Sequence, residues 1–372
     1  MKKANLIRDY LLKNPPKQNG DYDRIARLLN TTADNVRYHS RMLGLNLRAK
    51  EKKENKMTTK IMEVSDYVQE VLEQLPNYIK PLSPVRMYNV RQGKGKGDEE
   101  QVVQLLSDWQ LGHKTVSFNS EVAKQRVQKL LSGTMKIVDL HRSVYPINTI
   151  NLFLLGDFIQ NEKVGYLVDL SELENILIDQ VFQQAVPLLI NYISNISEYF
   201  QRVNVYCVRG NHGRGEKGSS EKTNWDDVIY RTLEIRFQND ERVHFEIARE
   251  FYQIVKIWNW KFLLAHGDQV RGGSYGIPLY ALLQRMLRWA TSMPFRWDAL
   301  CVGHWHNFAY LEQNQQFLIV NGTLVSDDEY IRKSYGWNAS TSQTLFSVHP
   351  KQGITWLYRI NLDKKNPETK IG

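Results

Sequence analysis

The sequence predicts a layered α/β sandwich preceded by a small all-α segment. Between residues 100 and 310, apolar runs of strand length alternate with helical patterns, a rhythm that is typical of α/β proteins. Residues 1–60 hold 15 Lys and Arg against 6 Asp and Glu, so the whole net charge of +9 lies in this segment. We therefore expect a basic amino-terminal part joined to an electrically balanced α/β part.

The amino-terminal part contains three short helical patterns. Residues 4–14 and 21–30 are separated by two prolines and a glycine, and residues 33–45 follow a short turn, with Gly44 suited to ending the helix. Ile25, Leu28 and Leu29 share one face of the second helix. Residues 1–48 resemble a helix-turn-helix domain with a recognition helix at 33–43. On the solvent side of that helix we expect DNA contacts from Asn35, Arg37, Tyr38 and Arg41.

The alternative for this part is a small helical bundle for protein contact, and the excess of positive charge favours DNA. Residues 49–99 are predicted to be a charged linker, with apolar residues at helical spacing that predict a helix at about 61–75. The apolar face of that helix suits either a homodimer contact or a contact with the α/β part. The sequence does not distinguish these two uses.

Polar side chains follow five apolar runs of the α/β part, which spans residues 100–372. The runs belong to the segments 101–113, 150–160, 205–214, 260–268 and 297–308. Carboxyl ends of strands are where open α/β sheets gather ligands. The side chains are two carboxylates, one amide and three imidazoles: Asp108, Asp157, Asn211, His266, His304 and His306. This set suits two cations that share a carboxylate, of the Mn, Fe or Zn type more than Mg alone.

Helices are predicted at about 119–142 and 171–200, between the first three motif strands. Residues 275–297 form an aromatic, arginine-rich helical pattern, which we interpret as core packing rather than a nucleic-acid groove. Residues 315–361 alternate apolar and polar side chains and are predicted to form the second sheet. Cys207 and Cys301 lie in predicted strands, where small core residues are expected rather than a disulfide or zinc pair.

The order D…GD…GNH…H…GHxH resembles the calcineurin-like metallophosphoesterases over roughly residues 100–360. The resemblance implies a four-layer α-β-β-α sandwich with two divalent metal ions, Mn first and Fe, Zn or Mg as alternatives. It implies that Asp157 bridges the two metals and that His212 is a catalytic residue that binds neither. One metal would be held by Asp108, Asp157 and His306, and the other by Asp157, Asn211, His266 and His304.

Two glutamines depart from the family pattern. The first motif is usually D-x-H, but here it is Asp108-Trp109-Gln110, so Gln110 is a weaker candidate ligand and His113 an uncertain substitute. The SbcD-like nuclease branch carries a histidine where this chain has Gln160. These departures place the strength of the first metal site, and the closeness to the SbcD-like enzymes, in question.

The expected function is a metal-dependent phosphodiesterase that cleaves DNA, as an endonuclease or exonuclease of a phage or a repair system, guided by the amino-terminal head. Two alternatives stay open: a small-molecule or nucleotide phosphoesterase with a DNA-binding regulatory head, and a catalytically weakened DNA-binding regulatory protein. The sequence contains no membrane-length apolar run and no signal-peptide pattern, so we expect a cytoplasmic protein of a bacterial or phage-infected cell.

Overall fold

A computed structural model describes residues 2–16, 21–43, 97–162, 173–215, 224–270, 277–327, 339 and 341–363. The chain divides into two compact units, residues 1–69 and 70–372, and each is described by itself. The predicted linker helix at about 61–75 lies outside the described residues. Among the described residues, no helix combines the length and the apolar character needed to cross a bilayer.

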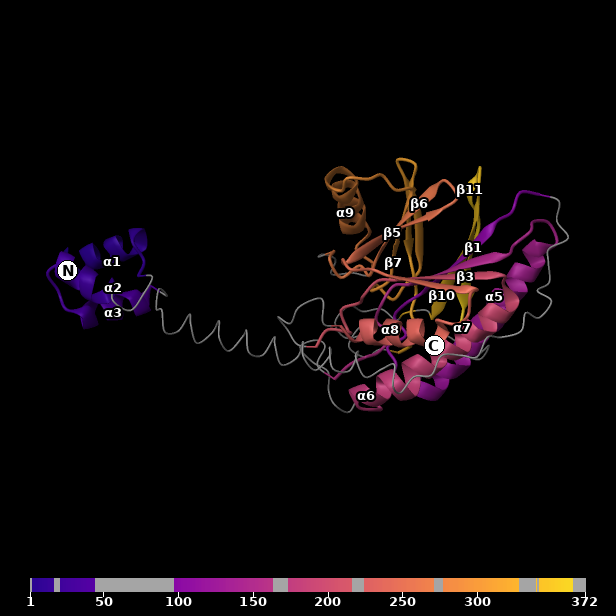
Figure 1. Cartoon of the computed structure of the whole chain (residues 1–372), viewed down its shortest axis with the longest axis horizontal. Helices are drawn as coiled ribbons and strands as arrows, with labels where there is room; N and C mark the ends of the chain where they lie inside the picture. The colour runs from indigo at the N-terminus through magenta and orange to yellow at the C-terminus, as the bar shows by residue number, and fades with distance from the viewer. Residues whose placement is uncertain are drawn as a thin grey trace, which may run out of the picture. The chain divides into compact units, whose positions relative to one another are not determined.

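The first unit contains three helices, α1 (Lys2–Lys13), α2 (Asp21–Leu28) and α3 (Ala33–Met42) (Figure 1). They pack around a small apolar core made of Ile7, Leu11, Tyr22, Ile25, Ala26 and Val36. Leu29 packs against this core, but Leu28 is 64% exposed, so the prediction that Leu28 shares a face with Ile25 and Leu29 is wrong. Helix α2 ends at Leu28, and the following turn directs the chain into α3.

The second unit is built on two mixed sheets. The first has the strand order β11-β10-β1-β2-β3-β4. Strands β1 to β4 are parallel, and β10 and β11 extend the sheet in antiparallel fashion beyond β1. The bounds are β1 Gln101–Leu106, β2 Thr149–Leu154, β3 Arg202–Cys207, β4 Val243–Ile247, β10 Ser342–His349 and β11 Gly353–Asn361.

The second sheet has the order β5-β6-β7-β9-β8, in which β6, β7 and β9 are parallel. Strands β5 and β8 pair antiparallel at its two edges. The bounds are β5 Tyr252–Ile257, β6 Trp260–Ala265, β7 Ala299–Val302, β8 Ala309–Gln313 and β9 Gln316–Val320.

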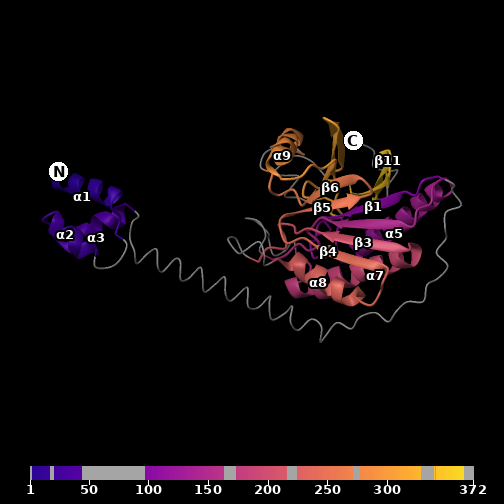
Figure 2. The same ribbon diagram turned by 45° about the horizontal axis from the view of Figure 1, so that its top comes forward.

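The two sheets pack face to face, and alternation along β6 shows how. Phe262 and Leu264 join a core between the sheets, together with Phe153 and Phe346 of the first sheet. Leu263 and Ala265 point to the other face, toward α9 (Leu279–Ser292). Helices lie on the outer face of the first sheet, so the unit has four layers, α-β-β-α (Figures 1 and 2). These are α5 (Ser120–Arg142), α7 (Val186–Tyr199) and α8 (Trp225–Phe237).

Several predicted elements differ from the structure. Only β9 of the segment 315–361 belongs to the second sheet, because β10 pairs with β1 and β11 pairs with β10, so that both extend the first sheet. The long helix predicted at 171–200 begins at α6 (Leu177–Asp179) and contains one π-helical segment, Gln180–Ala185, before α7. The helix predicted at 275–297 is α9. Trp289 on α9 and Trp297 after it are both buried, as the interpretation as core packing expected. Cys207 and Cys301 are buried and free.

Phe153 is a test of the packing between the sheets, because it is fully buried and contacts rings from both, Tyr206 and Phe262. Phe153→Ala should lower the free energy of unfolding of this unit by about 3–5 kcal/mol, through lost burial and the cavity left behind. Urea denaturation followed by tryptophan fluorescence measures the change. Val116→Ala is the control, since Val116 is 96% exposed and should change stability by less than about 0.5 kcal/mol. Equal, small effects of both variants would contradict the assigned core.

Candidate metal centre

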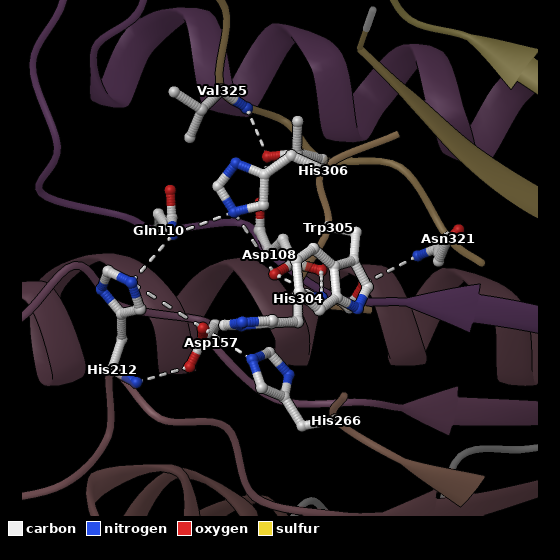
Figure 3. Close-up of polar contacts among 12 residues, drawn as sticks. Asp108, Gln110, Asp157, His212, His266, His304, Trp305, His306, Asn321 and Val325 are labelled. Atoms are coloured by element: carbon white, nitrogen blue, oxygen red, sulfur yellow. Dashed lines mark hydrogen bonds and ion pairs between the residues drawn. The ribbon is translucent and has the colours of Figure 1, made fainter. Parts of the chain in front are cut away.

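Five loops carry the predicted ligands, and each follows the carboxyl end of a motif strand. Asp108 follows β1, Asp157 follows β2 and Asn211 follows β3; His266 follows β6, and the GHWH segment follows β7. Since β1, β2 and β3 are parallel neighbours, as are β6 and β7, their carboxyl ends lie at the same edges of the two sheets. Figure 3 shows labelled side chains from these loops, including Asp108, Asp157, His212, His266 and His304, converging on one centre.

The backbone turns sharply where these side chains are presented. Five residues of the centre have positive φ angles of 42° to 66°, a left-handed conformation that is uncommon for residues other than glycine. Such conformations cluster at functional sites, where the surrounding structure holds them. The residues are Asp108, Gln110, Asp157, His304 and His306.

Asp157 is at the middle of the centre. Its Oδ2 lies 2.9 Å from Nε2 of His266, and that nitrogen lies 3.1 Å from Oδ1 of Asn211. The other ring nitrogen of His266, Nδ1, donates to the backbone oxygen of Leu155 at 2.7 Å. A carbonyl oxygen can only accept, so this contact fixes the tautomer and leaves Nε2 as the atom that can bind a metal.

His304 completes this group. One ligand atom from each of Asp157, His266 and His304 can be chosen such that all lie within 4.8 Å of one another, a spacing at which they could hold one metal ion. A carboxylate with two imidazoles suits Zn, Fe or Mn. The donor types and their spacing therefore fit a divalent transition metal at the position predicted for the second ion.

The position predicted for the first ion is arranged differently. Both carboxylate oxygens of Asp108 accept from the backbone N–H of His304, at 3.0 Å each, and Oδ1 lies 3.5 Å from Nε2 of His306. The amide nitrogen of Gln110 lies 3.2 Å from the same imidazole nitrogen. In this orientation Gln110 donates to His306, whereas a metal ligand would present its amide oxygen, so a ligand role requires the amide to turn.

His212 faces the centre without joining the ligand group. Its backbone N–H donates to Oδ1 of Asp157 at 2.7 Å, and its Nδ1 donates to the backbone oxygen of Gln160 at 2.9 Å. Its Nε2 therefore points toward the centre, 3.2 Å from the amide nitrogen of Gln110 and 3.9 Å from Oδ2 of Asp157. Gln160 thus contributes its backbone, not its side chain, to the position of His212.

Burial and close charges shift the pKa values of this centre. Burial raises the pKa of Asp108 to about 7, with His266 opposing the rise and Asp157 adding to it. For Asp157, burial acts to raise the pKa, but the charges of His266 and His212 hold it below its usual range. Burial acts to lower the pKa of His266, and the neighbouring Asp157 raises it to about 10. Asp157 therefore remains an anion, and a cation beside it is stabilised.

Two residues that support the centre carry no motif signal. Asn161 donates through its side chain to the backbone oxygens of His212 and Arg214, at 2.7 and 2.9 Å, and holds the loop after β3. Asp226, in the first turn of α8, accepts backbone N–H groups from the loops that carry Asp157 and Asn211. The sequence Asn224-Trp225-Asp226-Asp227 is a recognisable helix start. That pattern does not reveal which of its carboxylates points inward.

Other predicted residues lie outside this centre. His113 is buried in the loop after β1, where it forms a bridge with Leu173. On α3 of the first unit, Asn35, Arg37 and Tyr38 are exposed. Arg37 pairs with Asp34 at 2.9 Å. The side chain of Arg41 lies outside the described residues.

Comparisons with known proteins give similarity of structure only. No family model and no curated protein matches the sequence. Vacuolar protein sorting 29 from Cryptosporidium parvum is 16% identical, with 71% of this chain and 100% of that chain covered and a TM-score of 0.33. A novel archaeal phosphodiesterase is 13% identical, with 69% and 99% covered and a TM-score of 0.33. A predicted phosphoesterase from Streptococcus pneumoniae is 11% identical, with 71% and 99% covered and a TM-score of 0.28. Because these TM-scores are below 0.5, we base the function on the chain's own residues.

Metal binding by the Asp157, His266 and His304 group is directly testable. His266→Ala should weaken Mn²⁺ or Zn²⁺ binding by at least about 10-fold, because it removes a ligand whose orientation is already fixed by Leu155. Isothermal titration calorimetry of the metal-free protein measures the affinity. His244→Ala, which removes an exposed imidazole on β4, should bind as the wild type does. Equal affinities of wild type and His266→Ala would place the metal elsewhere.

Proposed function

We propose that this chain is a metal-dependent phosphodiesterase that hydrolyses DNA and is guided to it by a helix-turn-helix head. The observation that carries the proposal is the group of the buried Asp157 and His266 and the partly buried His304, with His212 held beside it by Asp157 and Gln160. Asp108, Asn211 and His306 surround the same group. The order of these residues along the chain agrees with the motif order of calcineurin-like metallophosphoesterases.

We expect this site to hold two divalent ions, Mn first. Asp157, Asn211, His266 and His304 would hold one ion, and Asp108, Asp157 and His306 the other. When bound, such ions supply a nucleophile from water at neutral pH and neutralise charge on the phosphoryl oxygens. Gln110 would join the first position only if its amide oxygen replaced its amide nitrogen there. The first position is therefore the weaker of the two.

His212 would act on the leaving oxygen. Its Nδ1 proton is committed to the carbonyl of Gln160, so the proton that it can exchange with substrate is on Nε2. Oδ2 of Asp157 lies 3.9 Å from this nitrogen. From this position His212 can donate a proton to the departing oxygen or neutralise charge that develops on the phosphoryl group.

The first unit supplies the proposed DNA contact. Helix α3 follows α2 after a short turn, presents Asn35, Arg37 and Tyr38 to solvent, and buries Val36. Polar and aromatic side chains on one exposed helix face suit a major groove, and the excess of Lys and Arg over residues 1–60 suits its phosphates. Tethering such a head to the hydrolytic unit raises the local concentration of phosphodiester. A homodimer through residues 61–75 would match a palindromic site.

This combination suits a nuclease of a bacterium or its phage, working in the cytoplasm in repair or recombination. A close relationship to the SbcD-like enzymes is not supported at position 160, because Gln160 stands where those enzymes carry a histidine. The alternative is a nucleotide or small phosphoester as substrate, since residues outside 1–60 carry 34 basic and 34 acidic side chains and no net charge. The other alternative is a catalytically weakened DNA-binding regulatory protein that has lost full metal loading, which both Gln110 and Gln160 permit.

Hydrolysis is tested with His212→Ala. With Mn²⁺ present, the variant should lose at least about 100-fold in kcat on labelled duplex DNA and on a chromogenic phosphodiester, because its proton donor is gone. Its metal content, measured by mass spectrometry, should match the wild type. His141→Ala, which removes another half-buried imidazole on α5, should remain active. Cleavage of the small ester alone would favour the alternative substrate, and wild type that cleaves neither would contradict the enzymatic proposal.

DNA binding is tested with a matched pair of arginines. Arg37 pairs with Asp34 on α3, and Arg231 pairs with Glu234 on α8; both pairs are exposed and three residues apart. Arg37→Ala should weaken binding to labelled duplex DNA and lower the slope of log affinity against log salt by about 1. Arg231→Ala should bind as the wild type does. Fluorescence anisotropy at several salt concentrations measures both, and equal slopes for the two variants would contradict a DNA contact by Arg37.

A further inference from the structure

The loops after β2 and β3, which carry Asp157 and Asn211, both donate backbone N–H groups to the buried carboxylate of Asp226, which belongs to neither loop. Asp226 is 0% exposed in the first turn of α8. Its Oδ2 accepts the backbone N–H of Gly210 at 2.8 Å and that of Asp157 at 3.1 Å, and its Oδ1 accepts the N–H of Phe158 at 3.4 Å. One side chain therefore contacts both the loop after β2 and the loop after β3.

These two loops touch through their backbones. Gly156 has a φ of +91°, and a methyl group on it would overlap the backbone of Gly210. A methyl group on Gly210 would in turn overlap the backbone and carboxylate of Asp157. A side chain at either glycine would collide with the other loop, so the two backbones approach each other closely here. Buried N–H groups need an acceptor, and Asp226 supplies it from a third element.

The spacing of the loops sets the spacing of the proposed ligands. Asp157 and Asn211 come from the two loops, and their oxygens lie 2.9 and 3.1 Å from one atom, Nε2 of His266. A shift of either loop would separate that set. We propose that Asp226 is a positioning residue that holds the two loops at this spacing and so determines how tightly the Asp157, Asn211, His266 and His304 group binds metal. This inference rests on the proposed function, because it requires that the group binds a metal ion.

Capping of α8 does not explain Asp226, because another residue performs it. Asn224 is the N-cap, and its Oδ1 accepts the backbone N–H of Asp226 at 2.8 Å. Its Nδ2 donates to the backbone oxygen of Gly210 at 2.8 Å. Gly210 is thus held on both sides by the start of α8, its oxygen by Asn224 and its N–H by Asp226. The neighbouring Asp227 instead pairs with Arg209.

Asp227 is therefore a matched control, since it is an acidic residue in the same helical turn that pairs with the side chain of Arg209 and not with the backbone N–H groups of Gly210, Asp157 and Phe158. Asp226→Ala leaves three backbone N–H groups without their acceptor. Asp226→Asn keeps one side-chain oxygen, which can still accept from Gly210 and Asp157. Its NH2 group, however, is a donor and cannot accept the N–H of Phe158. The expected order of metal affinity is wild type, then Asp226→Asn, then Asp226→Ala.

The experiment is calorimetric titration of the metal-free full chain with Mn²⁺, together with the visible absorption spectrum of the Co²⁺-loaded protein. Asp226→Ala should bind Mn²⁺ roughly 10- to 100-fold more weakly than wild type, as is found when partners that orient metal ligands are removed. The Co²⁺ bands should shift, because the geometry of the ligands changes. Asp227→Ala should leave both the affinity and the spectrum unchanged. Near-ultraviolet circular dichroism of each metal-free variant checks the fold, a readout independent of metal.

The outcomes separate this inference from the proposed function. A folded Asp226→Ala with wild-type affinity and an unchanged Co²⁺ spectrum overturns the positioning role. If Asp226→Ala does not fold, Asp226→Asn decides by the same two readings. A wild-type chain that binds no Mn²⁺ overturns the proposed function and this inference together, whereas unchanged binding in the variants overturns this inference alone.

Discussion

The buried negative charge of Asp157 is the constraint on which the centre depends. Asp157 is 1% exposed, and its two oxygens contact the backbone N–H of His212 and the ring of His266. Two further buried carboxylates lie nearby, and with burial as the main cause their pKa values rise, to about 7 for Asp108 and about 6 for Asp226. Three carboxylates with so little solvent need a compensating cation. The imidazole of His266, whose pKa Asp157 raises to about 10, supplies part of that charge, and divalent metal ions would supply more.

The fold brings these charged side chains together by the same arrangement in both sheets. Parallel strands β1, β2 and β3 end beside one another, and so do β6 and β7, and each loop then turns through a residue with positive φ or a glycine. The two proposed metal positions are not equal, however. Among the described residues, the group of Asp157, His266 and His304 has its ligand atoms already close together. Beside Asp108, the amide of Gln110 points its nitrogen at His306.

The sequence predicted the motif strands and the polar residues at their ends, because both depend on a local pattern: an apolar run followed by Asp, Asn or His. The four layers were implied by the family resemblance, not by that pattern. It misplaced β10 and β11, since alternation marks a strand but not the sheet it joins. The pairing of β10 with β1 depends on contacts between residues more than 200 positions apart, such as Gln101 with Val348. Asp226 was missed for the same reason: its partners Gly210 and Asp157 are distant in sequence, and a carboxylate in the first turn of a helix is ordinarily a surface residue.

The measurement that tests the central claim most directly is anomalous diffraction from crystals of the full chain grown with Mn²⁺. The account predicts one strong anomalous peak enclosed by Asp157, Asn211, His266 and His304. It predicts a second, weaker peak between Asp108, Asp157 and His306. Strong peaks only at other positions, or no peak within this centre at saturating Mn²⁺, would contradict a metal-dependent hydrolytic site.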